Sequence, residues 1–260
     1  MLEGRAAVVT GSTSGIGRAI AEALAAEGCA VMLNGFGEAE EIERQRAGIA
    51  DAHGVRVAYN PADMTRPDEI AALIVAAEAE LGAVDVLVNN AGIQHVAPIE
   101  AFPAERWDAV IAVDLSAAFH AISAALPGMK RGGWGRIINI ASVQGLVGSI
   151  HKAAYVAAKH GLVGLTKVVA LEAAESGVNC VAICPGWVRT PLIEKQIEAR
   201  ADADGIDVEE AGVAMLKDKQ ALPRFTTVEQ IGQLAVYLCS DAASTITGVA
   251  LPIDGGWTAQ

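Results

Sequence analysis

Hydrophobic and polar positions alternate along the chain in two rhythms. Short runs of consecutive apolar residues, as long as buried strands, are separated by longer stretches in which apolar side chains recur every three or four residues. In the first of these stretches Ile16, Ile20 and Leu24 share one helical face. The pattern predicts strands over residues 5–11, 29–35, 55–60, 84–92, 135–142, 178–186 and 248–256, and helices over residues 15–27, 38–52, 67–81, 104–130, 153–176 and 227–239.

Strands that alternate with helices indicate right-handed β-α-β units and a parallel sheet. We therefore expect an α/β fold with about seven parallel strands in one domain over residues 1–260. Residues 189–223 depart from the rhythm, because two short helical stretches, 191–200 and 207–219, follow the sixth strand. An insertion beyond the carboxyl end of a strand lies where open α/β sheets bind ligands. We interpret it as a lid; a surface excursion is the alternative.

Composition and charge narrow the class of partner. Hydrophobic residues make up 52% of the 260 residues and aromatic residues 4%, which is typical of helices packed on a buried parallel sheet. The formal net charge of −12 argues against nucleic acid and anionic membranes as partners. The amino-terminal residues show no signal-peptide pattern, and no uncharged apolar run has the length of a membrane span. We expect a cytoplasmic protein that binds neither nucleic acid nor membrane.

The four cysteines, Cys29, Cys180, Cys184 and Cys239, do not have the spacing of zinc ligands. Cys180 and Cys184 fall on one predicted strand, roughly 13 Å apart, which is too far for a disulfide. We expect no metal site.

A glycine-rich turn, "TGSTSGIG", joins the first predicted strand to the first predicted helix. A phosphate binds the free N–H groups of a helix N-terminus, and glycines such as Gly11, Gly15 and Gly17 allow its close approach. The turn therefore predicts a dinucleotide site, although a merely tight turn has a similar composition. No Lys or Arg stands at the tip of the second strand to meet a 2′-phosphate, and three glutamates follow within residues 38–41, so NAD is favoured.

Other strand tips complete the predicted nucleotide site. Asp63, after the third strand, is a candidate for the adenine edge, while Asn90 and Gly92 follow the fourth strand, where the cofactor must cross the sheet. The full set predicted to contact the dinucleotide is Gly11, Thr13, Gly15, Ile16, Gly17, Phe36, Asp63, Asn90, Gly92, Tyr155, Lys159, Pro185, Val188 and Thr190.

The stretch 149–161 places Lys152, Tyr155 and Lys159 on one helical face. Ser142, at the end of the fifth strand, can converge with Tyr155 on one point. We expect the Lys159 ammonium to lower the pKa of Tyr155 from about 10, so that a phenolate is reachable near neutral pH. Taken alone, a tyrosine four residues before a lysine is more often a solvated helix face.

Taken together, these motifs resemble the short-chain dehydrogenase/reductase family over the whole chain. The segments that carry the resemblance are "TGSTSGIG", "NNAG", Ser142, "YVAAK" and "PGWVRT". The resemblance implies a single Rossmann-type domain with a doubly wound parallel sheet and a nicotinamide cofactor. It also implies Tyr155 as the acid/base, with Ser142 and Lys159, and a homotetramer packed through residues 104–130 and 153–176.

Longer segments, including "HKAAYVAAKHGLVGLTKVVALE" and "CVAICPGWVRTPLIEKQIE", resemble the bacterial-type D-3-hydroxybutyrate dehydrogenase subfamily. The resemblance implies reversible, NAD-dependent oxidation of (R)-3-hydroxybutyrate to acetoacetate. It implies that Gln94, Lys152 and Gln196 hold the substrate carboxylate and that two tryptophans shape the site. The predicted substrate-binding set is Gln94, Ser142, Gln144, Lys152, Tyr155, Trp187, Gln196 and Trp257.

Two positions depart from that pattern. Gln144 stands where these enzymes usually carry His, so its side chain can donate to a carboxylate but cannot carry charge. Asp114 stands where the family usually has a catalytic Asn, and an ionised Asp beside Lys159 would favour the charged lysine. We retain Asp114 as a catalytic candidate. The alternatives are a short-chain reductase for a longer 3-oxo acid, an acyl thioester or a sugar, and a non-catalytic dinucleotide-binding protein.

Overall fold

A computed structural model describes residues 1–259, without the side chains of residues 191 and 192. Its strands are β1 (Ala6–Val9), β2 (Ala30–Asn34), β3 (Val57–Asn60), β4 (Val86–Asn89), β5 (Gly135–Ile140), β6 (Val178–Pro185) and β7 (Ala250–Ile253). All pairings are parallel, in the order β3-β2-β1-β4-β5-β6-β7. This confirms the predicted fold class, because each apolar run pairs with another on the sheet.

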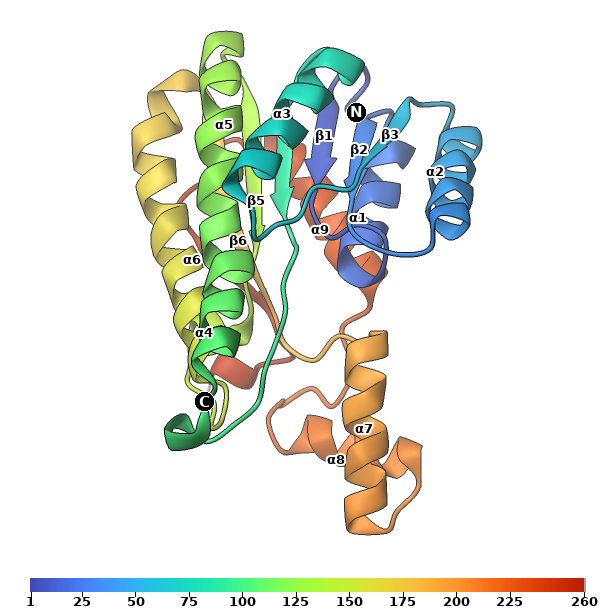
Figure 1. The fold of residues 1–260 in the computed structure, drawn as a ribbon, viewed down its shortest axis with the longest axis vertical. Coiled ribbons are helices and arrows are strands. Elements are labelled where there is room, and N and C mark those ends of the chain that lie inside the picture. The colour runs from blue at the N-terminus through green and yellow to red at the C-terminus, as the bar shows by residue number, and fades with distance from the viewer. Residues whose placement is uncertain (260) are drawn as a thin grey trace.

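Helices cover both faces of the sheet (Figure 1). They are α1 (Gly15–Ala26), α2 (Ala39–His53), α3 (Pro67–Leu81), α4 (Ala104–Ile111), α5 (Ala117–Gly132), α6 (Ala153–Ala173), α7 (Pro191–Asp204), α8 (Val208–Lys217) and α9 (Val228–Cys239). Alternate side chains of β1 point to opposite layers: Val9 packs in the cluster with α1 and α9, and Val8 in the cluster with α3 and α5. Burial on both faces explains the continuous apolar runs.

The strand order reverses between β1 and β4, which is where doubly wound sheets bind ligands. Helices α7 and α8 extend beyond the carboxyl ends of the strands, below the sheet in Figure 1. They share a small apolar cluster of their own around Ile197 and Met215. The insertion predicted at residues 189–223 thus lies at the ligand-binding edge.

The helical stretch predicted over 104–130 is interrupted. Between α4 and α5 lies η2 (Ala112–Ser116), a π-helical turn, which inserts an extra residue into the helix and rotates α5 relative to α4. By length and composition Ala104–Gly132 and Ala153–Ser176 could each cross a membrane, but 39% and 44% of these windows are buried in the fold. Within these runs, α5 packs beside β4 and β5 and α6 beside β5 and β6, as layer helices of an α/β fold do, so their apolar composition is weak evidence for a membrane.

A close contact joins the turn after β5 to helix α6. The 3₁₀ turn η3 (Val143–Gly145) begins at Ser142, and a Cβ at Gly145 would lie 2.8 Å from the Lys159 carbonyl oxygen. Only a glycine therefore lets the turn rest directly on α6. This contact fixes the position of Ser142 relative to the helix that carries Tyr155 and Lys159.

We expect Gly145→Ala to destabilise the fold by about 1–3 kcal/mol, because the methyl group meets backbone rather than a flexible side chain. Gly148→Ala is the matched control, since a Cβ there has no neighbour within 4 Å. Thermal unfolding of both variants checks this, together with the rate of turnover. Equal melting temperatures for the two variants would contradict the packing argument.

Candidate active site

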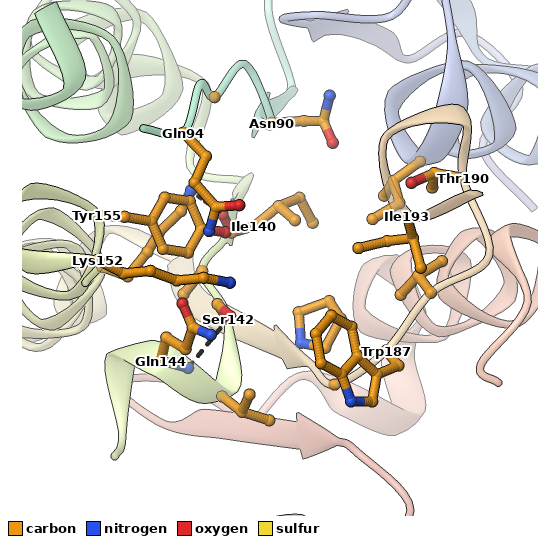
Figure 2. A pocket seen from close by; sticks show the side chains of 18 of the residues that line it. Asn90, Gln94, Ile140, Ser142, Gln144, Lys152, Tyr155, Trp187, Thr190 and Ile193 are labelled. Carbon is orange, nitrogen blue, oxygen red and sulfur yellow. Dashed lines mark hydrogen bonds between the residues drawn. The ribbon is translucent and has the colours of Figure 1, made fainter. Parts of the chain in front are cut away.

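A cavity of about 190 Å³ opens beyond the carboxyl ends of β4, β5 and β6. Figure 2 shows Gln94, Lys152 and Tyr155 on one side of it and Trp187 and Ile193 on the other. Every residue predicted to bind substrate lines this cavity: Gln94, Ser142, Gln144, Lys152, Tyr155, Trp187, Gln196 and Trp257. The sheet, α6 and the lid therefore converge on one space.

Three candidate catalytic residues meet at one wall of the cavity. Ser142 follows β5, and its Oγ accepts the backbone N–H of Gln144 at 3.1 Å. On α6, one turn separates Tyr155 from Lys159, and the lysine Nζ lies 5.4 Å from the centre of the tyrosine ring. The arrangement brings a hydroxyl, a phenol and an ammonium together, as the motif predicts.

Two oxygen atoms hold the ammonium of Lys159 in place. Its Nζ donates to the carbonyl oxygen of Ile140, at the end of β5, at 3.0 Å. It also lies 3.3 Å from Oδ2 of Asp114, and the two side chains are only 4% and 0% exposed. The other oxygen of Asp114 accepts the backbone N–H of Ile93 at 2.8 Å. Asp114 thus lies behind Lys159 rather than in the cavity.

The expected net lowering of the Tyr155 pKa is wrong. Burial raises the pKa of Tyr155 above its ordinary value and outweighs the Lys159 ammonium and the Ser142 hydroxyl, which lower it, while the Asp114 carboxylate adds to the rise. Burial also lowers the pKa of Lys159, but Asp114 outweighs this and the pKa is raised, so Lys159 stays charged. Burial raises the pKa of Asp114, against the effect of Lys159.

Beside these residues, the cavity is lined by polar groups that have no partner among the described residues. Lys152 is the N-cap of α6, and it forms no ion pair in the part of the chain that the structure describes. Burial lowers the pKa of its ammonium, whose Nζ lies 5.8 Å from the centre of the Trp187 ring. Gln144 is only 5% exposed, and its Oε1 has no hydrogen-bond partner. A bound anion would pair with the Lys152 ammonium, and it would also interact favourably with the N-terminus of α6.

Two tryptophans close one side of the cavity, with ring centres 5.6 Å apart. Trp257 is held there by Asp254, whose carboxylate accepts the backbone N–H of Gly256 at 2.9 Å and the hydroxyl of Thr258 at 2.7 Å. Asp254 and Thr258 are absent from the predicted site. The Asp-Gly-Gly sequence just after β7 is typical of a turn, and this signal could have predicted the hydrogen bonds that Asp254 accepts.

The glycine-rich turn forms a cradle beside the cavity. Ser14, the N-cap of α1, makes no side-chain cap bond, so the first N–H groups of the helix remain available to a phosphate. A Cβ at Gly17 would lie 2.3 Å from Asn90 Nδ2 and 2.4 Å from the Gly11 carbonyl oxygen, so only a glycine lets the helix start close against the turn. Asn90 donates to the carbonyl oxygens of Thr10 and Gly11 at 2.9 and 3.0 Å and ties β4 to the turn. These residues fit a pyrophosphate.

The predicted nucleotide residues fall into three groups. Those that line the cavity are Ile16, Asn90, Gly92, Tyr155, Lys159, Pro185, Val188 and Thr190, whereas Gly11, Thr13, Gly15 and Gly17 form the turn. Phe36, 69% exposed at the end of β2, does not line the cavity, and its carbonyl oxygen accepts the Thr13 hydroxyl. Asp63 also lies outside the cavity, where its Oδ1 accepts two hydrogen bonds from Thr65. Contacts of Phe36 and Asp63 with a dinucleotide stay predictions.

The described residues contain no group of His, Cys, Asp and Glu side chains that could hold a metal ion. All four cysteines are buried and free, and burial raises the pKa of Cys184, close to Ser142, to about 11.

Comparison with known proteins decides the family. The family model described as short chain dehydrogenase matches residues 5–201. The chain belongs to the short-chain dehydrogenase family. Members of this family use a nicotinamide dinucleotide, which the cradle and the cavity fit, and which donates or accepts a hydride when bound.

Individual relatives of this short-chain dehydrogenase are similar over their full length. A D-beta-hydroxybutyrate dehydrogenase from Cupriavidus necator is 56% identical over 261 residues, with 100% of each chain covered. A protein of the same name from Rhizobium meliloti is 54% identical, with 98% of this chain and 99% of the relative covered. Among solved structures, levodione reductase superposes with a TM-score of 0.91 at 32% identity and covers 100% of this chain and 99% of its own.

Proposed function

We propose that the protein oxidises (R)-3-hydroxybutyrate to acetoacetate, reversibly, with NAD as the cofactor. The observation that carries the proposal is the distribution of charge in the cavity. Ser142 and Tyr155 line the cavity together with a cation, Lys152, which has no anion to pair it among the described residues. The D-beta-hydroxybutyrate dehydrogenases at 56% and 54% identity support the same substrate.

The spacing of Lys152 and Tyr155 suits a short hydroxy acid. Lys152 precedes Tyr155 by three residues, which is about 4.5 Å along a helix axis. A substrate whose carboxylate lies at Lys152 and Gln144 would place a hydroxyl two carbons away beside Ser142 and Tyr155. Trp187 and Trp257 limit the length of the acid on the far side.

Each catalytic residue has a distinct task in this proposal. Ser142 holds the substrate oxygen by a hydrogen bond, and Tyr155 as phenolate takes the hydroxyl proton during oxidation or returns it, as phenol, during reduction. Lys159 stabilises the phenolate and holds the nicotinamide ribose. Gln94 and Gln196 complete the carboxylate site, with Gln196 carried on α7 so that closure of the lid would exclude water.

The preference for NAD rests on the end of β2. Residues 34–38 contain no Lys or Arg, and Arg44 and Arg46 on α2 are paired with Glu41 and Glu43. A 2′-phosphate would therefore meet acidic side chains and no available cation. Contacts of Asp63 and Phe36 with the adenosine half belong to the same proposal.

The homotetramer and the cytoplasmic location are also proposals. Phe119 on α5 and Val168 and Leu171 on α6 are exposed by 53%, 51% and 82%, which supports association through these two helices. The acidic surface is consistent with a protein that binds no nucleic acid.

The alternative reductases fit the cavity less well. A carrier-bound 3-oxoacyl thioester or a sugar has no carboxylate near the reacting carbon, so Lys152 would stay unpaired. A non-catalytic dinucleotide-binding protein would have no need for Ser142, Tyr155 and Lys159 in contact with one cavity.

A panel of initial rates tests the proposal. We expect turnover of (R)-3-hydroxybutyrate with NAD, little turnover of the (S) acid, and at least about tenfold lower kcat/KM with NADP, since a repulsion of about 1.4 kcal/mol corresponds to a factor of ten. Longer 3-hydroxy acids should be poorer substrates. Activity confined to uncharged alcohols would contradict the proposal, and binding of NADH without turnover of any substrate would favour the non-catalytic alternative.

Replacing Lys152 tests the carboxylate site directly. We expect Lys152→Ala to raise KM for 3-hydroxybutyrate by about tenfold to a hundredfold, because a hydrogen bond to a charged group contributes about 1.5–3 kcal/mol. Steady-state kinetics measure this. Lys195→Ala is the matched control, since Lys195 is exposed on α7 and does not line the cavity.

An uncharged substrate separates loss of charge from loss of structure. With 4-hydroxypentan-2-one, which carries a methyl ketone in place of the carboxylate, Lys152→Ala and the unmodified protein should have similar kcat/KM values. An equal loss on both substrates would show that Lys152 acts on the fold rather than on the anion.

A further inference from the structure

Asp114 lies in an irregular part of the helical layer, between α4 and α5. It lies in the π-helical turn η2, and its carboxylate meets the ammonium of Lys159 without an intervening group, at 3.3 Å. A Cβ at Gly92 would lie 3.0 Å from Asp114 Oδ2 and 3.6 Å from Lys159 Nζ. The glycine leaves room for the pair, and both charges are shielded from water.

The pair changes the charge that Tyr155 experiences. An amide at position 114 would leave Lys159 as a full positive charge beside the phenol, whereas an ionised carboxylate makes the buried pair neutral overall. Besides Lys159, the titratable groups that act on Tyr155 are Asp114 from η2 and Cys184 from β6. Both disfavour the phenolate, and burial, the largest effect, acts in the same sense, whereas the hydrogen bond with Ser142 favours the phenolate.

We propose that Asp114 is a positioning residue that serves as the fixed counter-ion of Lys159, and that this pairing keeps Tyr155 in its phenol form at neutral pH. The site then works most readily as a proton donor to a keto acid, and oxidation of the hydroxy acid needs alkaline pH. The substrate in this statement rests on the proposed function, whereas the state of Tyr155 does not.

Reduction and oxidation place different demands on the Tyr155 proton. In reduction the carbonyl carbon gains a hydride from the reduced dinucleotide, the carbonyl oxygen gains the Tyr155 proton, and the phenolate regains a proton from solvent. In oxidation Tyr155 must first lose that proton to solvent before it can accept the proton of the substrate hydroxyl. The pairing therefore slows oxidation at neutral pH without hindering reduction.

Spectrophotometric titration of the protein without cofactor or substrate tests the proposal. Tyrosinate absorbance is followed against pH, and the curve of Tyr155→Phe is subtracted to remove the other two of the three tyrosines. We expect the Tyr155 midpoint to lie above pH 10, its unperturbed value, in the unmodified protein. Asp114→Asn should lower that midpoint by about one pH unit or more, since it leaves the Lys159 charge uncompensated.

An unchanged midpoint in Asp114→Asn would overturn the proposal, because it would mean that Asp114 carries no charge felt by Tyr155. Should Asp114→Asn fail to fold, the unmodified protein still decides, since a Tyr155 midpoint at or below pH 9 contradicts the pairing. In a second arm, the rising limb of kcat for oxidation against pH should move to lower pH in Asp114→Asn by the same amount. The titration needs no substrate, so failure of the proposed function would leave its result intact.

Discussion

The structure depends on one buried cation in particular, the ammonium of Lys159. Placing an ammonium out of water costs several kcal/mol unless oxygens compensate it. Ile140 supplies one oxygen from the end of β5, and Asp114 supplies the other from the π-helical turn. The sheet edge, helix α6 and the turn between α4 and α5 must therefore come together around this ammonium. That convergence also creates the wall of the cavity on which Tyr155 lies.

The same cavity contains a second cation, for which the described residues supply no counter-ion. Lys152 lies at the N-terminus of α6, where the helix dipole disfavours a positive charge, and burial lowers its pKa. A cation in such a place is stabilised by an anionic ligand. In the proposed function, the protein compensates the charge of Lys159 and the substrate carboxylate compensates that of Lys152, so that one lysine supports the chemistry while the other selects an acid.

The fold was predictable from the sequence because the apolar runs and the helical periodicity are strong and regular. The motifs at strand ends were equally informative, since parallel strands bring their carboxyl ends to one edge. Interruption of residues 104–130 by a π-helical turn was not predictable, because both helix types bury apolar residues at similar spacing. The direct pairing of Asp114 with Lys159 depends on that turn and on the space left by Gly92.

Other features were hidden because they depend on packing. The pKa of Tyr155 is set chiefly by burial, which a sequence does not measure, and its net direction was therefore predicted wrongly. The contact of Gly145 with the Lys159 carbonyl oxygen joins segments that the motifs treat separately. Asp254 holds Trp257 in place by accepting hydrogen bonds from backbone N–H groups and from the Thr258 hydroxyl. In the sequence, only the neighbouring turn residues indicate these hydrogen bonds.

A crystal structure of Tyr155→Phe with NAD and (R)-3-hydroxybutyrate tests the central claim most directly, because the variant keeps the site but lacks the group that takes the substrate proton. We expect the substrate carboxylate within about 3.5 Å of the Lys152 Nζ and the hydroxyl within hydrogen-bond distance of Ser142 Oγ. A carboxylate turned toward solvent, with Lys152 still unpaired, would contradict the division of labour between the two lysines.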